Sequence, residues 1–435
     1  MDVWAVGVDT PLIENLAYGD VSDYLELPEG DYTLELRVAP SQAGDAAAYS
    51  QVLSVPADAT ITATAFGSLT STATDNSFRI GAFVEDWDVV AMDTARVRVV
   101  HGSPDAGTVA IDVGNDGTPE LPQVPLFAES GSAGVELPAG ESIAIGVWAT
   151  DMDGNPTEPV TAFTTPELPD GAELFVIATG FASKLAREDG GLSLLAIAPD
   201  GPVGFIRQDP VVYALHAGPD APSVDIFAGG SELVDDLAFG DISQPLQVPP
   251  GSYALDFFGH AVGDTRPGDS PAASATTPPL EAGQQYLAIA AGLLDDSNGE
   301  GVGLIPLAEG FSLGSADGLL RVVHASGDAP AVDIGPVAGG IVTPLAPLTG
   351  VPFGVDSGAD GIALPAATYE LGVSANSDVD SNALFAFPGI DLMGGERWFV
   401  VSAGSVAGVN DNGFRLLAVD TGASPWDVIE VAPVD

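Results

Sequence analysis

The sequence contains no cysteine and a single lysine, Lys184. Its 435 residues carry 11 cationic and 62 acidic side chains, so the formal net charge is −51 at pH 7. Without thiols, cysteine catalysis and thiolate metal sites are excluded. Nucleic acid and anionic lipid bind to clustered Lys and Arg, so neither is expected as a partner. The acidic surface favours cations; it is typical of a halophilic or marine source and equally of a GC-rich genome, which depletes lysine.

Long hydrophobic runs are missing as well. No apolar stretch reaches the ~18 residues that a transmembrane helix needs, so direct membrane insertion is not expected. A strand-like pattern follows Met1 without a signal peptide, which leaves two readings: a mature end made by processing, or a chain cut short at its start. Hydrophobic residues nevertheless make up 46% of the chain, so the acidity does not indicate disorder.

Helix signals are nearly absent, whereas strand signals are dense. Short alternating apolar runs, such as residues 96–100, 109–113 and 142–148, are separated by Gly, Pro, Asp and Asn. The β-branched and aromatic residues in these runs favour strands over helices. About seven or eight short strands at this spacing predict an antiparallel β-sandwich of immunoglobulin-like build.

One sequence motif, called the His phrase below, occurs three times in the chain. It reads His101-Gly102-Ser103-Pro104-Asp105-Ala106, His216-Ala217-Gly218-Pro219-Asp220-Ala221 and His324-Ala325-Ser326-Gly327-Asp328-Ala329. An alternating strand with an Asp follows each copy. When Asp112, Asp225 and Asp333 are aligned with Asp2, they recur at a nearly constant interval. That interval, roughly 110 residues, is too long for a solenoid repeat and has the size of an independent domain.

The period predicts an all-β chain of four tandem immunoglobulin-like antiparallel β-sandwiches, here called modules 1 to 4. Their expected ranges are 1–95, 96–210, 211–318 and 319–435. Module 1 lacks the opening strand and the His phrase, and module 4 continues into a C-terminal tail strand. A β module without one strand has an open edge that something must cover. Because the linkers are short, we expect a stiff rod.

The phrase at residues 216–226, with the downstream Pro-Pro-Gly-Ser-Tyr turn at 249–253, resembles the bacterial and archaeal surface modules known as domain of unknown function 4397. The resemblance extends over all four modules. Module 1 departs from it by lacking the His segment, and module 4 by Gly327 in place of Pro and Ala367 in place of the turn Gly. The resemblance implies an exported β-sandwich, extracellular or on the cell surface, and no established activity.

The repeated His and Asp residues are interpreted as structural. Each His ends a first strand, where it can bond the backbone of the following turn, and each Asp can cap that turn. Three copies with the same neighbours favour structure over catalysis, and no nucleophile elbow accompanies them. The predicted structural-turn residues are His101, Asp105, His216, Asp220, His324 and Asp328. We therefore expect no enzyme.

Acidic loops are the candidates for cation binding. Residues 151–155 resemble the start of a Ca²⁺ loop but lack the Glu at its twelfth position, and a similar acidic stretch lies at a comparable place in module 4. Asp, Asn and Gly also form ordinary turns, so the alternative is a solvated loop. The predicted ligands are Asp151, Asp153, Asn155, Asp378 and Asp380, with calcium as the candidate cofactor.

Two tryptophans share a phrase, Trp87-Asp88-Val89-Val90 after module 1 and Trp426-Asp427-Val428-Ile429 after module 4. The first leads into the opening strand of module 2. By analogy, the second is expected to enter the empty place in module 1 of another copy, as a strand donated between subunits. The alternative is a frayed tail. The predicted subunit-contact residues are Trp426, Val428, Ile429, Val431 and Val434.

These patterns favour a non-catalytic structural protein of the cell surface. It would be a stiff acidic rod that polymerises head to tail into a filament, because a contact that does not close gives an open assembly. The alternative is an adhesion module that binds a surface glycan or protein through its loop tips, with calcium.

Overall fold

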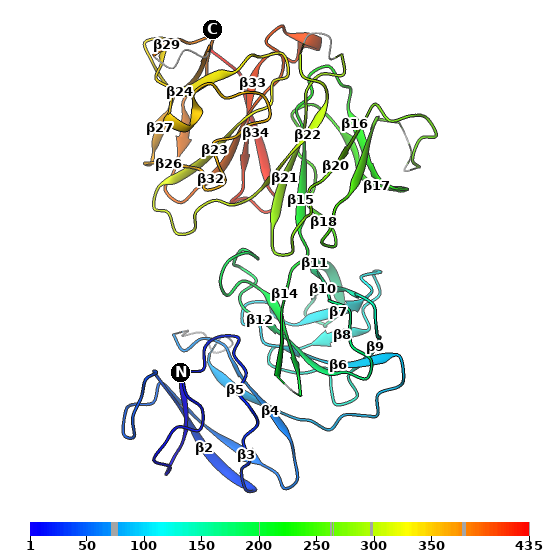
Figure 1. The fold of residues 1–435 in the computed structure, drawn as a ribbon, viewed down its shortest axis with the longest axis vertical. Helices are drawn as coiled ribbons and strands as arrows, with labels where there is room; N and C mark the ends of the chain where they lie inside the picture. The colour runs from blue at the N-terminus through cyan, green and yellow to red at the C-terminus, as the bar shows by residue number, and fades with distance from the viewer. Residues whose placement is uncertain are drawn as a thin grey trace. The chain divides into compact units, whose positions relative to one another are not determined.

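A computed structural model describes residues 1–70, 77–199, 201–261, 263, 265–295, 299–375 and 380–434. The chain is 48% strand and 1% helix, which confirms the all-β prediction. Two compact units divide it, Met1–Asp209 (unit 1) and Pro210–Asp435 (unit 2), and each holds two modules of the repeat (Figure 1). The predicted boundaries near 95 and 318, and the count of four immunoglobulin-like sandwiches, stay predictions.

Unit 1 is built from the sheets of modules 1 and 2. Module 1 contributes a three-stranded sheet, β1-β2-β3, and a hairpin, β4-β5; module 2 contributes β11-β10-β7-β8 and β14-β13-β12-β6-β9. The strands are β1 Asp2–Ala5, β2 Gly30–Arg37, β3 Tyr49–Val55, β4 Ile61–Phe66, β5 Arg79–Val84, β6 Thr94–His101, β7 Val109–Val113, β8 Leu121–Val124, β9 Val135–Pro138, β10 Ala144–Thr150, β11 Pro156–Thr164, β12 Glu173–Thr179, β13 Ser193–Ala198 and β14 Gly201–Arg207.

Unit 2 repeats this plan. Module 3 forms β18-β15-β21-β22 and β17-β16-β19-β20; module 4 forms β26-β23-β32-β33-β34, β29-β25-β24-β28-β30 and the hairpin β27-β31. The elements of module 3 are β15 Val211–His216, β16 Val224–Ala228, β17 Ser231–Leu237, β18 Leu246–Gln247, β19 Ala254–Gly259, β20 Ala273–Thr276, β21 Gln285–Ala291 and β22 Gly303–Ala308. Those of module 4 are β23 Gly318–His324, β24 Val332–Ala338, β25 Ile341–Val342, η3 Ala346–Leu348, β26 Ile362–Leu364, β27 Ala367–Tyr369, β28 Leu371–Ala375, β29 Ser381–Asn382, β30 Phe385–Ala386, β31 Ile390–Leu392, β32 Arg397–Ala403, η4 Val409–Asp411, β33 Arg415–Asp420 and β34 Asp427–Val431.

The opening strand of modules 2, 3 and 4 is not antiparallel to both of its neighbours. β6 runs parallel to β12, β15 to β21 and β23 to β32, so the expectation of purely antiparallel sheets is wrong at this pairing. A strand that opens a module pairs with one that nearly closes it, because the chain crosses between the two sheets in between. The repeated His is the last residue of each opening strand.

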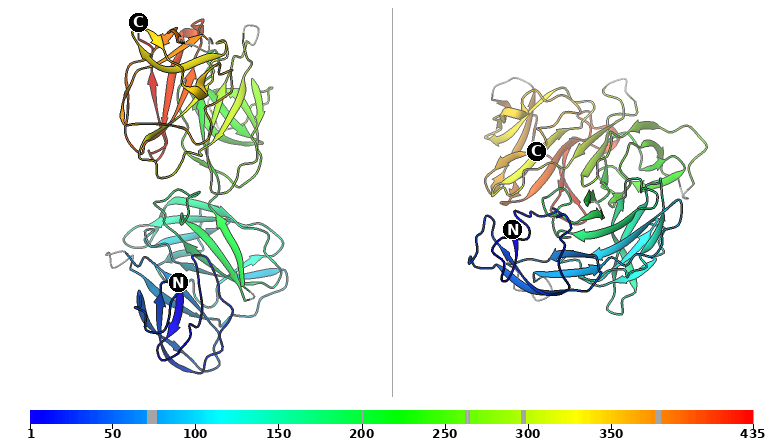
Figure 2. Two further views of the ribbon diagram at one scale, coloured as in Figure 1. Left: turned by 60° about the vertical axis from the view of Figure 1, so that its left-hand side comes forward. Right: turned by 60° about the horizontal axis from the view of Figure 1, so that its bottom comes forward.

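Modules 3 and 4 share one hydrophobic core. Their outward-facing residues on β15 and β21 pack against those on β23, β32 and β33, so that Leu215 and Ile289 of module 3 belong to the same buried cluster as Val323 and Phe399 of module 4. The second sheet of each module packs on the opposite face of its first sheet. Unit 2 is therefore a stack of sheets, and the labels β24, β32, β21 and β16 follow it across Figure 1. Figure 2 shows the same strands from two further sides.

One alignment made from the sequence needs correction. The His residues bond the carbonyl of the sixth residue after them in all three copies, which places Ala110, not Asp112, at the position of Asp225 and Asp333. Asp112 lies two residues later and accepts the backbone N–H of Asp116 and Gly117 in its own turn. The sequence alignment matched residue type, whereas the backbone register decides position.

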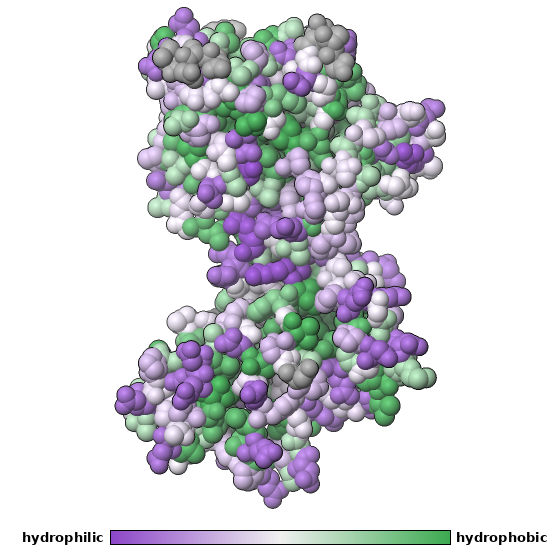
Figure 3. Space-filling view, in the orientation of Figure 1, coloured by the Kyte–Doolittle hydropathy of each residue, from purple (hydrophilic) through white to green (hydrophobic). Residues whose placement is uncertain are grey.

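Within the described residues, no helix is long and apolar enough to cross a membrane. The helical segments η3 and η4 are single turns. Hydrophilic side chains are scattered over the visible face of both units, as the acidic composition predicts (Figure 3).

Candidate functional site

The three repeated histidines are buried at the ends of the opening strands, each at most 2% exposed. Nε2 of His101 lies 2.5 Å from the carbonyl oxygen of Gly107, and the Nε2 atoms of His216 and His324 lie 3.1 Å from those of Pro222 and Pro330. Because a carbonyl only accepts, Nε2 carries the proton. Burial lowers the pKa of each imidazole, although the bond to the carbonyl opposes the shift. This is the geometry of a neutral structural group.

The Asp of each His phrase holds a loop that is distant in sequence, through hydrogen bonds to its backbone. Asp105, Asp220 and Asp328 accept two backbone N–H groups each from the loop that follows β12, β21 or β32, at 2.7–3.0 Å. The cap predicted within the local turn therefore reaches 74 to 79 residues along the chain. Burial alone would raise the pKa of Asp105 and Asp328, but hydrogen bonds, led by those from Ser183 and Ser405, outweigh burial and lower it.

Replacing His216 by alanine is expected to lower the free energy of unfolding of unit 2 by about 1–3 kcal/mol at pH 8, because buried backbone groups lose their partner. The loss should shrink towards pH 5.5. The folded pKa of His216 is lowered below the unfolded value of about 6.5, so the unfolded chain binds the proton first and the wild type loses stability as pH falls. Urea unfolding of both proteins at several pH values measures this; a loss that grows on acidification would contradict it.

Module 1 has an open place where the other modules hold their opening strand. In modules 2 to 4 that strand lies between a long strand (β12, β21 or β32) and the short strand before the Pro turn (β9, β18 or β26). In module 1 the long strand is β4, which pairs with β5 alone among the described residues. Residues 21–28, at the place of the short strand, form no strand. Among the described residues, no strand pairs with the other edge of β4.

Side chains around this position are exposed where their counterparts are buried. A glycine with positive φ follows each equivalent strand and fixes the alignment (Gly67, Gly180, Gly292 and Gly404). It places Ala65 at the position of Ala290, which pairs with His216 and is buried. Ala63 and Ala65 are both exposed, and across the open position Tyr24 and Leu25 are 53% and 45% exposed. Tyr24 donates to Glu85, which also accepts from Thr62 of β4, so residues 21–28 lie near β4.

A family model described as domain of unknown function (DUF4397) matches residues 1–112 and 210–335, more than half of the chain. The chain belongs to the DUF4397 family. Each match starts where a unit starts and ends within or just past the second strand of that unit's second module. The family pattern therefore occurs once per unit.

No curated protein matches the DUF4397 chain. The solved structure of the Bacillus anthracis TIE protein is similar to it, with 10% sequence identity and a TM-score of 0.15. The similarity covers 86% of this chain and 59% of that one, so the chain spans about three fifths of that protein's length.

Trp426, a predicted subunit contact, lies inside unit 2 of the DUF4397 chain. Its ring stacks on Tyr213 of module 3, with centroids 4.4 Å apart and an interplanar angle of 9°, and also contacts Phe399. Trp87 occupies the comparable place in unit 1, against Phe175 of module 2. The shared Trp-Asp-Val phrase thus marks an aromatic residue that joins two modules.

The strand after Trp426 is already paired within the chain. β34, which contains Val428, Ile429 and Val431, runs antiparallel to β33 and takes the place that β14 takes beside β13 in module 2. Val434 forms a bridge with Ala386. Ile429 and Val434 remain 50% and 53% exposed. Contact of these residues with a second subunit stays a prediction, and it requires β34 to exchange β33 for another partner.

The predicted metal ligands form an ordinary turn where the structure describes them. Asp151 accepts the backbone N–H groups of Asp153 and Asn155 at 2.9 and 2.8 Å and the Asn155 side-chain amide at 3.0 Å. Hydrogen bonds, chiefly from Asn155, lower the pKa of Asp151. Asp380 is exposed just before β29, and Asp378 lies outside the described residues. Calcium at either loop stays a prediction.

A cluster absent from the sequence analysis surrounds His260. One ligand atom each from Asp225, Asp235 and His260 lie within 4.8 Å of one another. His260 Nδ1 lies 2.9 Å from Asp225 and 3.2 Å from Asp235, and the hydrogen bond to Asp225 raises the pKa of His260. An ion pair accounts for this arrangement. His260 is the one histidine outside the repeated His phrase. This difference is the sequence signal that could have pointed to the cluster.

Proposed function

We propose that this DUF4397 chain is a non-catalytic, exported surface protein that joins copies of itself by strand addition at module 1. The open position beside β4 carries the proposal, because the same position in modules 2 to 4 holds a β-strand. Strand addition gives affinity through main-chain hydrogen bonds and register through side-chain pockets. The acidic composition argues against nucleic-acid binding, because nucleic acid is bound by clustered Lys and Arg. The His and Asp residues, which act as clips, support an architectural role.

The donor in this proposal is β34 of a second copy. β34 is an edge strand whose outer residue Ile429 is half exposed, so exchanging β33 for β4 costs one strand pairing and recovers another. Exchange of an identical element between copies is a low-cost route to assembly. Because the acceptor is module 1 and the donor is β34 of module 4, each copy accepts and donates through different modules, and repetition of this head-to-tail contact produces a filament.

Ala63→Lys tests the acceptor. Ala63 is exposed in the single chain, so the change should alter the free energy of unfolding by no more than about 0.5 kcal/mol, as is typical of surface positions. In the assembled state the lysine would be buried beneath the donated strand without a partner, which is strongly unfavourable. Sedimentation velocity at increasing concentration should show assemblies for the wild type and monomers for the variant. Val52→Lys, at a 57% exposed position on β3, is the matched control and should assemble.

Ile429→Asp tests the donor in the same way, and mixing the variants tests both together. Each variant alone should be monomeric. A mixture should form dimers, because the Ala63→Lys chain still donates and the Ile429→Asp chain still accepts. Deleting residues 424–434 is a poor substitute, since it removes Trp426 from the core. A wild type that sediments as a monomer at all concentrations, or a mixture that does not pair, would overturn the proposal.

A further inference from the structure

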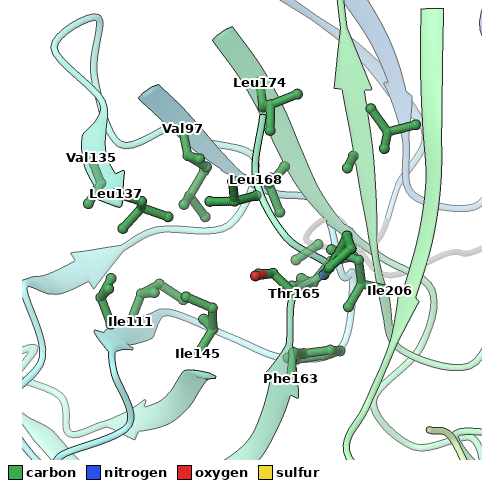
Figure 4. Close-up of a pocket in the computed structure, with 18 of the residues that line it drawn as sticks. Val97, Ile111, Val135, Leu137, Ile145, Phe163, Thr165, Leu168, Leu174 and Ile206 are labelled. Atoms are coloured by element: carbon green, nitrogen blue, oxygen red, sulfur yellow. The ribbon is translucent and has the colours of Figure 1, made fainter. Parts of the chain in front are cut away.

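Module 2 encloses a large apolar cavity between its two sheets. Its volume is about 650 Å³, and β6, β12 and β13 line one side while β7, β10 and β11 line the other. The labelled lining side chains point into a common space and expose almost only carbon, with the Thr165 hydroxyl as the polar exception (Figure 4). Protein interiors are normally packed with few voids larger than a water molecule. The cavity therefore departs from ordinary sandwich packing.

Module 3 has the same strand arrangement, but side chains fill most of the corresponding space. The cavity at the equivalent position measures about 40 Å³. Val147 and Phe257 pair with the equivalent residues Ile111 and Ile226, so a valine in module 2 stands where module 3 has a phenylalanine.

The Pro turn at one end of the sandwich also differs between the modules. Tyr32, Tyr253 and Tyr369 each bond the carbonyl of a turn proline. In module 2 the residue at that place is Ile143, as the matching bonds from its backbone N–H to Thr165 and from that of Tyr253 to Thr277 show. Module 2 thus lacks two large side chains that module 3 has, whereas module 4 keeps the tyrosine but has Val373 at the position of Phe257.

A cavity of this size and lining suits a small organic molecule. Ligand sites commonly measure about 300–1,000 Å³ and are mostly apolar. Water needs several polar partners to be stable in such a space, and an engineered cavity of about 150 Å³ in another protein stays dry and binds benzene. The lining reaches the surface at the loop around residues 166–171, where Pro166, Glu167 and Pro169 are exposed. This loop provides an entrance.

One buried polar atom in the lining has no partner. His101 is 1% exposed, and its Nδ1 accepts no hydrogen bond from the described residues. In modules 3 and 4 the equivalent Nδ1 atoms accept the backbone N–H of Gly218 and Ser326, at 3.2 and 3.4 Å. Because Nε2–H of His101 is donated to Gly107, Nδ1 is an acceptor. This atom is also closed off from water-sized molecules, so the cavity offers a ligand mostly carbon.

The charges around the cavity restrict the class of ligand further. The polar residues at the edge of the cavity are carboxylates, Glu167 and Glu173, and the whole chain is strongly acidic. An anionic head group would therefore be repelled by these carboxylates. An uncharged ligand meets no such repulsion.

We propose that module 2 binds an uncharged, largely apolar molecule, of the long-chain hydrocarbon, fatty-alcohol or isoprenoid class, in this cavity. This role is independent of strand addition at module 1. It gives the chain a carrier site within an architectural scaffold.

The proposal is tested on the full chain with the neutral fluorescent probe N-phenyl-1-naphthylamine. The wild type should take up the probe with an increase in fluorescence, and 1-decanol should displace it at concentrations at least about tenfold lower than decanoate, since burying a carboxylate beside Glu167 and Glu173 is unfavourable. Absence of probe uptake would overturn the proposal. Displacement by decanoate as effective as that by 1-decanol would overturn the restriction to uncharged ligands.

Val147→Phe locates the site. It inserts the side chain that module 3 carries at the same place, and it should weaken probe and decanol binding at least about tenfold while the melting temperature is kept or raised, because the added atoms fill a void. Val160→Phe, the same change at a 53% exposed position on β11, is the control and should bind normally. Unchanged binding by a folded Val147→Phe protein would show that the probe binds elsewhere and would overturn the proposal.

Discussion

Replacing Trp426 by alanine is expected to lower the free energy of unfolding of unit 2 by about 3–5 kcal/mol, the cost of truncating a large buried aromatic residue. Trp426 is 4% exposed and stacks between Tyr213 of module 3 and Phe399 of module 4. The change opens a void in the core that both modules share, so both should be destabilised together. Urea unfolding followed by circular dichroism measures the loss.

Hydrogen exchange shows whether the destabilisation crosses between modules. Amides of β15, which opens unit 2 and is remote from Trp426 in sequence, should exchange faster in the variant, because local openings in a shared core are coupled. Trp148→Ala in unit 1 is the matched control and should leave exchange in unit 2 unaltered. If β15 exchanged at its wild-type rate in the Trp426→Ala protein, modules 3 and 4 would be independent in spite of their common core.

Arg321→Ala is the second change with a large expected effect, about 3–5 kcal/mol, because it removes a buried side chain and leaves the partly buried Asp356 carboxylate without its charged partner. The guanidinium donates from Nε and Nη2 to the two Asp356 oxygens at 3.0 Å, and from Nη1 to the carbonyl of Ala308 at 2.7 Å. That carbonyl ends the last strand of module 3, so Arg321 also ties module 4 to module 3. Thermal unfolding of unit 2 checks the loss.

The expected loss of stability depends on how deeply the ion pair is buried, and a second arginine tests this dependence. The Arg266 side chain is 34% exposed and pairs with Asp256 near the surface, where ion pairs contribute at most about 1 kcal/mol. Arg266→Ala should therefore cost far less than Arg321→Ala. Asp356→Asn should lower the free energy of unfolding by part of the loss caused by Arg321→Ala. If both arginine variants lost only a small and equal amount, Arg321 would be solvated in the folded chain.

Local pattern predicted the strands well, because each alternating run carries its own evidence of a half-buried surface. The His phrase predicted structural turns because it recurs with the same neighbours, and the contacts of His101, His216 and His324 are those of such turns. Asp112 was misplaced because the alignment matched residue type, although Asp112 lies two positions after Ala110, the residue at the place of Asp225 and Asp333. Backbone hydrogen bonds distinguish the two positions, and these bonds depend on register.

Two features had no local signal. The packing of module 3 on module 4 depends on which outward faces are apolar, and alternation is hidden where both faces of a strand are buried, as in Leu319–Val323. The cavity depends on the absence of volume at Val147 and Ile143, residues that read as ordinary strand positions. Only comparison of equivalent positions in three dimensions shows that something large is missing there.

The parallel pairing of opening and late strands also affects how fast the chain can fold. Leu319 on β23 pairs with Arg397 on β32, and Val211 on β15 pairs with Gln285 on β21, so the partners are separated by most of a module's sequence. Contacts of such long sequence separation slow folding, to milliseconds or seconds in all-β domains. An opening strand that leaves a ribosome or a translocation channel must wait unpaired until its late partner has emerged. The chain would therefore stay unfolded during synthesis for most of the length of each module.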